Sequence, residues 1–226
     1  GDITVNGAYG LGIYATGAAS TVANTKNITL TGDEVIGAFG TNSSNINLTS
    51  GTVSLTGNKS TGYYLDAGTG STIASGTKID VTGNEANGVY ANNGSSLTYD
   101  GDTTVDGDAA YGLIADGGST VNATGGTLTV KGTSGINGTS SGANTNRGSA
   151  ALVVTSGSNL TGGLDVTADV AGDNSVGVYS AGSLAMNSAN ISAYDSGVNF
   201  FTDGGTISVG NNGGTSTVVA GTGANK

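Results

Sequence analysis

Residues 88–108 read GVYANNGSSLTYDGDTTVDGD, and three short runs in this stretch alternate apolar with polar or small side chains. The runs are GVYA, SSLTY and TTVDGD, and Gly, Asn, Ser and Asp residues separate them. Alternation with a period of two is typical of β-strands, and glycine beside asparagine or aspartate is typical of turns. The stretch therefore predicts three short strands joined by tight corners, without a helix.

Close copies of this stretch recur along the chain. A first signature, glycine followed by mostly apolar residues, recurs at intervals of 24 to 26 residues, apart from single intervals of 39 and 20 residues. Its copies start at Gly12, Gly37, Gly62, Gly88, Gly112, Ala151, Gly177 and Gly197. A second signature usually ends in a glycine turn, and its copies start at Ile3, Ile28, Val53, Ile79, Thr103, Leu128, Leu164 and Ile191. A short third run lies between the two, at 20–22, 45–47, 71–73, 95–99, 119–122 and 158–160.

A repeat of this length, built only from strands, predicts a solenoid in which each copy stacks on the next. We predict an all-β protein, a right-handed parallel β-helix with three short strands per coil, about 25 residues per coil and about eight coils. We expect residues 1–226 to form a single β-helical segment of a longer polypeptide. The interval of 39 residues predicts a loop that projects at 133–150, and residues 211–226 read as a low-complexity end or a degenerate coil.

Strand alternation also assigns the two faces of each strand. In the second signature the aliphatic pairs point inward, namely Ile28/Leu30, Val53/Leu55, Ile79/Val81, Leu128/Val130 and Leu164/Val166. In the first signature the inward pairs are Ile13/Ala15, Val89/Ala91, Leu113/Ala115, Leu152/Val154 and Val178/Ser180. The position between them then points outward, and it holds Tyr14, Phe39, Tyr64, Tyr90, Ile114, Val153 and Tyr179. The glycines and the Asn or Asp residues after them suit corners with positive φ, at Asp33, Asn58, Asn84, Asp108 and Asp173.

Composition narrows the classes of function. The net charge is −10, from 6 basic and 16 acidic residues, and such a field repels nucleic acid. The chain contains no cysteine, which excludes disulfides and thiolate chemistry. No apolar run approaches the ~18–20 residues that span a membrane as a helix. We expect no nucleic-acid partner and no direct insertion of this segment into a membrane.

The three repeated signatures resemble the passenger domains of type V autotransporters. The tyrosine-containing copies, such as GVYA at Gly88, and the composition without Cys and Pro are most similar to the large fusobacterial outer-membrane adhesins. The resemblance covers residue 3 to about residue 209. It implies secretion, display at the bacterial outer-membrane surface and adhesion to host or bacterial cells through a protein or glycan receptor. A segment of this kind is also expected to self-associate.

Enzyme chemistry has one candidate site. The chain has no histidine, which excludes a Ser-His-Asp triad and histidine-ligated zinc. Parallel β-helices also include polysaccharide-degrading enzymes, and Asp100, Asp102, Asp106 and Asp108 could supply the paired carboxylates of a hydrolase. The alternative is turn chemistry, since aspartate is favoured beside glycine at corners. The same cluster could hold calcium, but no calcium-binding motif is present, and we expect no cofactor and no metal. Ice binding by outward Thr and Ser pairs is disfavoured, because charges interrupt four of the six pairs.

Two features are candidates for binding a partner. The first is the outward aromatic row, whose alternative role is to stabilise the sheet by stacking. The second is the 133–150 loop, whose alternative role is plain surface decoration. We predict a non-enzymatic adhesin segment, with a pure spacer as the main alternative. The candidate contact residues are Tyr14, Phe39, Tyr64, Tyr90, Tyr179, Asn137, Asn144 and Arg147.

Overall fold

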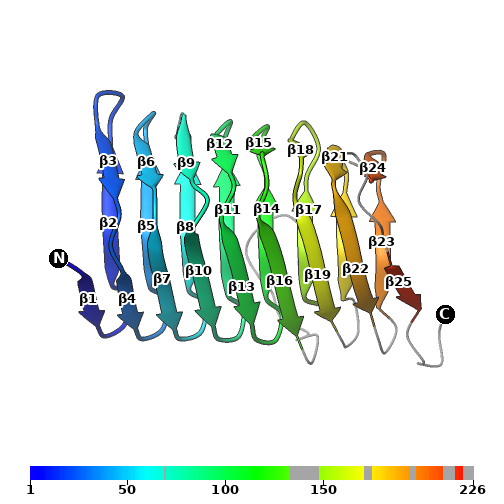
Figure 1. Cartoon of the computed structure of the whole chain (residues 1–226), viewed down its shortest axis with the longest axis horizontal. Coiled ribbons are helices and arrows are strands. Elements are labelled where there is room, and N and C mark those ends of the chain that lie inside the picture. The colour runs from blue at the N-terminus through cyan, green and yellow to red at the C-terminus, as the bar shows by residue number, and fades with distance from the viewer. Residues whose placement is uncertain (69, 133–147, 171–174, 194–196, 211–216, 221–226) are drawn as a thin grey trace.

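The computed structural model describes residues 1–68, 70–132, 148–170, 175–193, 197–210 and 217–220. All regular structure in these ranges is β-strand, in 25 strands numbered along the chain. The strands lie side by side along a rod, with the two termini at opposite ends (Figure 1). Each coil contributes one strand to each of three parallel sheets, so neighbours within a sheet lie three strands apart in the sequence. The predicted all-β parallel β-helix, with three strands and about 25 residues per coil, is confirmed.

The three sheets hold nine, eight and eight strands, in agreement with the predicted number of about eight coils. Sheet A contains β1 (Ile3–Asn6), β4 (Ile28–Thr31), β7 (Gly51–Thr56), β10 (Thr77–Thr82), β13 (Asp102–Asp106), β16 (Thr127–Gly132), β19 (Asp165–Val170), β22 (Ser188–Ala193) and β25 (Thr217–Ala220). Sheet B contains β2 (Leu11–Thr16), β5 (Ile36–Thr41), β8 (Thr61–Asp66), β11 (Asn87–Asn92), β14 (Tyr111–Ala115), β17 (Ala150–Val154), β20 (Val176–Ser180) and β23 (Val198–Thr202). Sheet C contains β3 (Thr21–Asn24), β6 (Asn45–Leu48), β9 (Ser71–Ile73), β12 (Ser96–Tyr99), β15 (Thr120–Ala123), β18 (Asn159–Gly162), β21 (Ser183–Met186) and β24 (Thr206–Val209).

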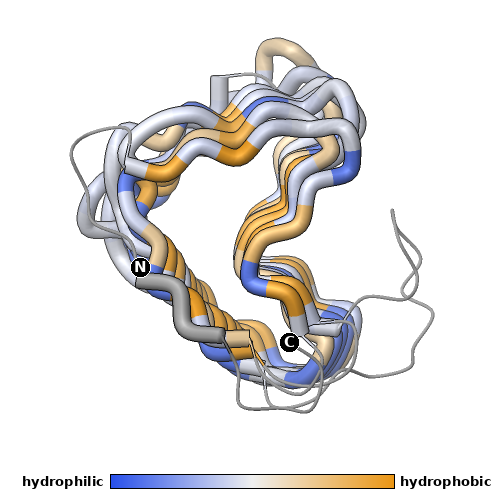
Figure 2. The backbone as a smooth tube through the Cα atoms, turned by 90° about the vertical axis from the view of Figure 1, so that its right-hand side faces the viewer, coloured by the Kyte–Doolittle hydropathy of each residue, from blue (hydrophilic) through white to orange (hydrophobic). Residues whose placement is uncertain are grey.

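Apolar side chains fill the inside of the coils along the rod. Seen down the axis, successive coils follow one outline, and the hydrophobic positions of different coils lie in line (Figure 2). All ten inward pairs predicted from alternation are buried. Burying this continuous stripe from coil to coil is the main favourable term in the fold.

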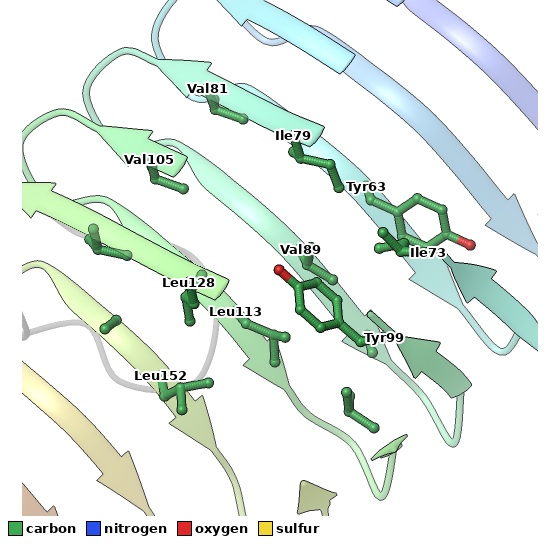
Figure 3. Close-up of a cluster of buried hydrophobic side chains, with 14 of the residues drawn as sticks. Tyr63, Ile73, Ile79, Val81, Val89, Tyr99, Val105, Leu113, Leu128 and Leu152 are labelled. Carbon is green, nitrogen blue, oxygen red and sulfur yellow. The ribbon is translucent and has the colours of Figure 1, made fainter. Parts of the chain in front are cut away.

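Two tyrosines lie inside the coils, which strand alternation had left unassigned. Tyr63 of β8 and Tyr99 of β12 are fully buried among aliphatic side chains (Figure 3). The Tyr63 hydroxyl donates a hydrogen bond to the Ile46 carbonyl oxygen at 2.8 Å. Burial raises the pKa of both hydroxyls above the ordinary value of 10.0. Each ring therefore fills core volume and keeps its hydroxyl satisfied.

The glycine at the start of the first signature allows sheets A and B to approach closely. A Cβ atom on Gly62 would meet Cγ2 of Ile79 in sheet A, and it would lie 2.7 Å from the carbonyl oxygen of Gly88 in the next coil. The stacked carbonyl cannot move without breaking the ladder of strands. A side chain at this position is therefore excluded by packing.

Two predicted registers are wrong. In the last coil Val176 pairs with Val198, and Val178 pairs with Phe200, so Asn199 and not Gly197 occupies the position of Gly177. In β19, Val166 pairs with Leu128 and Ala168 with Val130. The outward pair at that level is therefore Thr167/Asp169 and not Asp165/Thr167, although Leu164 is buried as predicted. In both copies a changed interval between repeats obscured the alignment in the sequence.

The predicted corner conformation is also wrong in detail. Positive φ occurs at Gly32, Gly57 and Gly83, and again two residues later at Glu34, Lys59 and Glu85, but not at the Asn or Asp between them. Those side chains bond from coil to coil instead. The Asn58 amide donates to Asp33 Oδ1 at 2.8 Å, the Asn84 amide to Asn58 Oδ1 at 3.0 Å, and the Asp108 amide to Asn84 Oδ1 at 3.1 Å. Asp173 lies outside the described residues.

Candidate contact surface

Four aromatic side chains lie in a row on the outer face of sheet B, one from each of the first four coils. The register pairs Tyr14 of β2 with Phe39 of β5, Phe39 with Tyr64 of β8, and Tyr64 with Tyr90 of β11. Their ring centroids are 5.5, 5.0 and 5.1 Å apart in that order. We call Tyr14, Phe39, Tyr64 and Tyr90 the aromatic row. The prediction that these four side chains point outward in register is confirmed.

The rings of the aromatic row cover one another's faces. Phe39 and Tyr64 are stacked at an interplanar angle of 6°, and Tyr64 and Tyr90 at 21°. Tyr14 is 53% exposed, whereas the other three rings are partly buried. A partner that approaches the middle of the row therefore meets ring edges and hydroxyl groups, and only Tyr14 at the end offers an open face.

Polar side chains flank the row one strand position pair further on. Asp66 pairs with Asn92 across β8 and β11, and the Tyr90 hydroxyl donates to Asp116 Oδ2 at 3.1 Å. Burial raises the pKa of Tyr90, and the Asp116 carboxylate raises it further. Burial likewise raises the pKa of Tyr64. Both hydroxyls therefore stay protonated and remain hydrogen-bond donors at neutral pH.

The same face is closed off in the C-terminal half of the rod. Val153 and Tyr179 point away from the coil interior, but they are only 5% and 3% exposed. They form a second apolar cluster with Ala150 and Val176, against which Tyr111, Ile114 and Ala181 pack. The expectation of an exposed ring at Tyr179 is therefore wrong, because this ring is covered within the cluster.

Phe201 of β23 continues the line of Tyr179 at the end of the rod, and it was not among the predicted contact residues. Its ring centroid lies 5.8 Å from that of Tyr179, and its side chain is 43% exposed. The shifted register of the last coil hid this residue, since the glycine anchor at Gly197 places the wrong residues outward. The three other predicted contact residues, Asn137, Asn144 and Arg147, lie outside the described residues, as does most of the 133–150 loop.

The four aspartates proposed for catalysis lie at both ends of β13. Asp102 Oδ1 accepts hydrogen bonds from the amide of Thr127 at 3.2 Å and from its hydroxyl at 2.7 Å. Asp108 follows Asn84 in the corner ladder described above. Two of the four residues are thus engaged in contacts between coils. In the described ranges, no group of three or more His, Cys, Asp or Glu side chains is arranged to hold a metal ion.

The described part of the chain has no helix of the length and apolar character needed to cross a membrane. Comparison of the sequence with protein-family models and with curated proteins, and of the structure with solved structures, gives no match. The fold and the arrangement of side chains on it are therefore the basis for inferring a function.

Proposed function

We propose that the chain is a non-enzymatic extracellular segment of a bacterial surface adhesin, of the autotransporter passenger type. In this role it serves as a rigid stalk and as a polyvalent contact surface at the outer-membrane surface. Its partner is a protein or glycan receptor on host or bacterial cells. The observation that supports the proposal is the aromatic row, which repeats one kind of side chain on one face of a continuous solenoid.

The solenoid supports the stalk role because every coil is hydrogen-bonded to the next through all three sheets. Eight coils at about 4.8 Å per coil give a rod of roughly 40 Å. Bending such a rod would stretch one sheet and compress the others, so it holds its direction. A stiff rod keeps attached groups at a fixed distance from its anchor.

The row supports the contact role because weak contacts at fixed spacing add up through avidity. Tyrosine combines apolar area with a hydroxyl, and it is enriched at binding hot spots. Tyr14 offers an open ring, and Tyr64 and Tyr90 present donors beside Asp66 and Asp116. This combination favours a receptor with apolar groups and hydrogen-bond acceptors in alternation.

The stacking itself favours the second candidate, a pure spacer whose binding site lies elsewhere in the polypeptide. The near-parallel rings of Phe39 and Tyr64 already bury each other, and the Tyr90 hydroxyl is taken up by Asp116. Such contacts stabilise neighbouring strands without a partner. The engagement of Asp102 and Asp108 between coils likewise favours a structural role over a catalytic one.

Binding of the labelled 226-residue chain to epithelial cells and to bacterial cells tests the proposal. We expect saturable binding that unlabelled chain displaces. A variant without residues 133–150 shows whether the candidate residues Asn137, Asn144 and Arg147 contribute. If the folded chain binds neither cell type, the contact role is wrong and the segment is a spacer.

A further inference from the structure

The exposed large apolar side chains of the described residues gather at the two ends of the rod. They are Tyr9, Leu11 and Tyr14 in and just before β2, and Val198 and Phe201 in β23. β2 and β23 are the two edge strands of sheet B. Each of these side chains lacks the neighbouring coil that covers its equivalents elsewhere in the sheet.

The core is open at the same two ends. Six partly buried apolar side chains pack against the main core cluster, and all of them belong to terminal strands. Ile3, Val5 and Val22 come from β1 and β3, whereas Phe200, Ile207 and Val209 come from β23 and β24. Each end therefore presents the cross-section of an unfinished core.

The backbone is unpaired at both ends as well. β1, β2 and β3 each pair with one strand only, and so do β25, β23 and β24 at the opposite end. An unpaired strand edge offers a row of N–H and C=O groups to another strand. Three such edges side by side offer a template for one complete further coil.

The two ends match each other row by row. Leu11 and Val198 belong to one row of the sheet B register, and Tyr14 and Phe201 belong to the next row. In sheet C, Val22 and Ile207 occupy one inward row. A coil that continued the C-terminal end would thus need the kinds of side chain that the N-terminal end carries.

We propose that this chain associates end to end with a second copy of itself, with the C-terminal coil of one copy stacked on the N-terminal coil of the next. β25, β23 and β24 then pair with β1, β2 and β3 of the second copy, in parallel and within the same three sheets. Phe201 stacks on Tyr14, and Val198 packs beside Leu11. Self-association thereby acquires a definite geometry that does not depend on the proposed adhesin role.

Strand polarity selects this arrangement over a two-fold one. Two N-terminal ends facing each other would meet with antiparallel strands and a mirrored outline, so the three sheets could not all continue. Head-to-tail contact continues all three. It also leaves one free end on each copy, so the assembly is an open filament and not a closed dimer.

Charge sets the conditions for this assembly. Lys26 is the one charged residue within 11–31, and Asp203 is the one within 197–210, so the joined faces carry little charge. The whole chain nevertheless carries a net charge of −10, which makes copies repel at long range. Because salt screens this repulsion, assembly increases with ionic strength.

Two variants, each blocked at one end, test the proposal by sedimentation velocity. Leu11→Lys with Tyr14→Lys blocks the N-terminal end, and Val198→Lys with Phe201→Lys blocks the C-terminal end. All four side chains are exposed, so the folded coil tolerates the changes. A control with the same added charge, Thr82→Lys with Thr120→Lys, changes exposed positions of middle coils. Circular dichroism verifies that each variant is folded.

We expect the unchanged chain and the control to form species larger than a dimer as concentration and salt rise. Each blocked variant alone stays monomeric, while an equimolar mixture of the two forms a dimer and nothing larger. A chain that stays monomeric at all concentrations and salt levels overturns the proposal. So does a blocked variant that associates with itself, because end-to-end contact in one direction forbids it.

Discussion

The hydroxyl of Tyr99 donates a hydrogen bond to Oγ1 of Thr103 at 2.9 Å, inside the coil and across the corner from sheet C to sheet A. Thr103 is 1% exposed, so its hydroxyl has no access to solvent. The same tyrosine hydroxyl lies 3.1 Å from the carbonyl oxygen of Thr127 in the next coil. This one group therefore links two strands of its own coil and the coil beyond.

Replacing Tyr99 with Phe removes these hydrogen bonds and keeps the ring. Leaving a buried polar group without a partner costs about 1–3 kcal/mol, so we expect a loss of that size in the free energy of unfolding. Urea denaturation followed by circular dichroism measures it. Tyr90→Phe is the control, because Asp116 keeps bonds from Gly117 and Thr155 and should lose little. Equal losses in the two variants would contradict the assigned role of Tyr99.

Gly62→Ala places a methyl group against the side chain of Ile79 and the carbonyl oxygen of Gly88. We expect the free energy of unfolding to fall by about 1–3 kcal/mol, since overpacking at this position pushes on the backbone of the next coil. At Gly125 an added Cβ would meet only the carboxylate of Asp100, which can rotate away. Thermal denaturation of both alanine variants should show a clearly larger decrease in Tm for Gly62→Ala.

The corner ladder predicts a difference between two substitutions of Asn58. Its Oδ1 accepts the Asn84 amide at 3.0 Å, and Asn58→Ala removes this acceptor at a cost of about 1 kcal/mol. Asn58→Asp keeps the acceptor but adds a charge one coil from Asp33. We expect Asn58→Asp to approach the original stability in high salt and to fall below it in low salt. A loss for Asn58→Asp that is independent of salt would argue against the ladder.

Stability should fall in alkaline solution. Burial raises the pKa of Tyr63, Tyr64, Tyr90 and Tyr99 above the ordinary value of 10.0. Above that pH the unfolded chain loses these protons while the folded chain retains them, so the unfolded state is favoured as pH rises. Below pH 10 the four groups add no pH dependence. Unfolding free energies measured from pH 9 upward, with Tyr63→Phe beside the original chain, should show a shallower decline for the variant.

The sequence allowed the fold to be predicted because the repeat interval and the alternation of side chains agree at most levels. Ile79 and Val81 could be placed inside from one strand alone. The last coil could not be aligned correctly, because Asn199 replaces the glycine that marks the position elsewhere and Gly197 lies two residues away. Where a repeat loses its marker, only hydrogen-bonded pairing with the previous coil defines the register.

The surface was harder to predict than the core. Alternation correctly placed Tyr14 and Tyr64 on the outer face, but it could not show that Tyr179 is covered in a second apolar cluster. It also left Tyr63 and Tyr99 unassigned, because tyrosine is as common at surfaces as inside. Their burial depends on acceptors from other strands, such as the Ile46 carbonyl oxygen, which the local sequence does not reveal.

The central claim, that the aromatic row contacts a receptor, is tested most directly by comparing saturation binding of two variants to epithelial and bacterial cells. Tyr14→Ser with Tyr64→Ser removes aromatic surface from the row, and Thr29→Ala with Thr82→Ala changes the outer face of sheet A to a similar extent. The account predicts that the first variant, verified as folded, binds at least tenfold more weakly, a change of about 1.4 kcal/mol, while the second binds like the original chain. Equal binding by all three chains would contradict it.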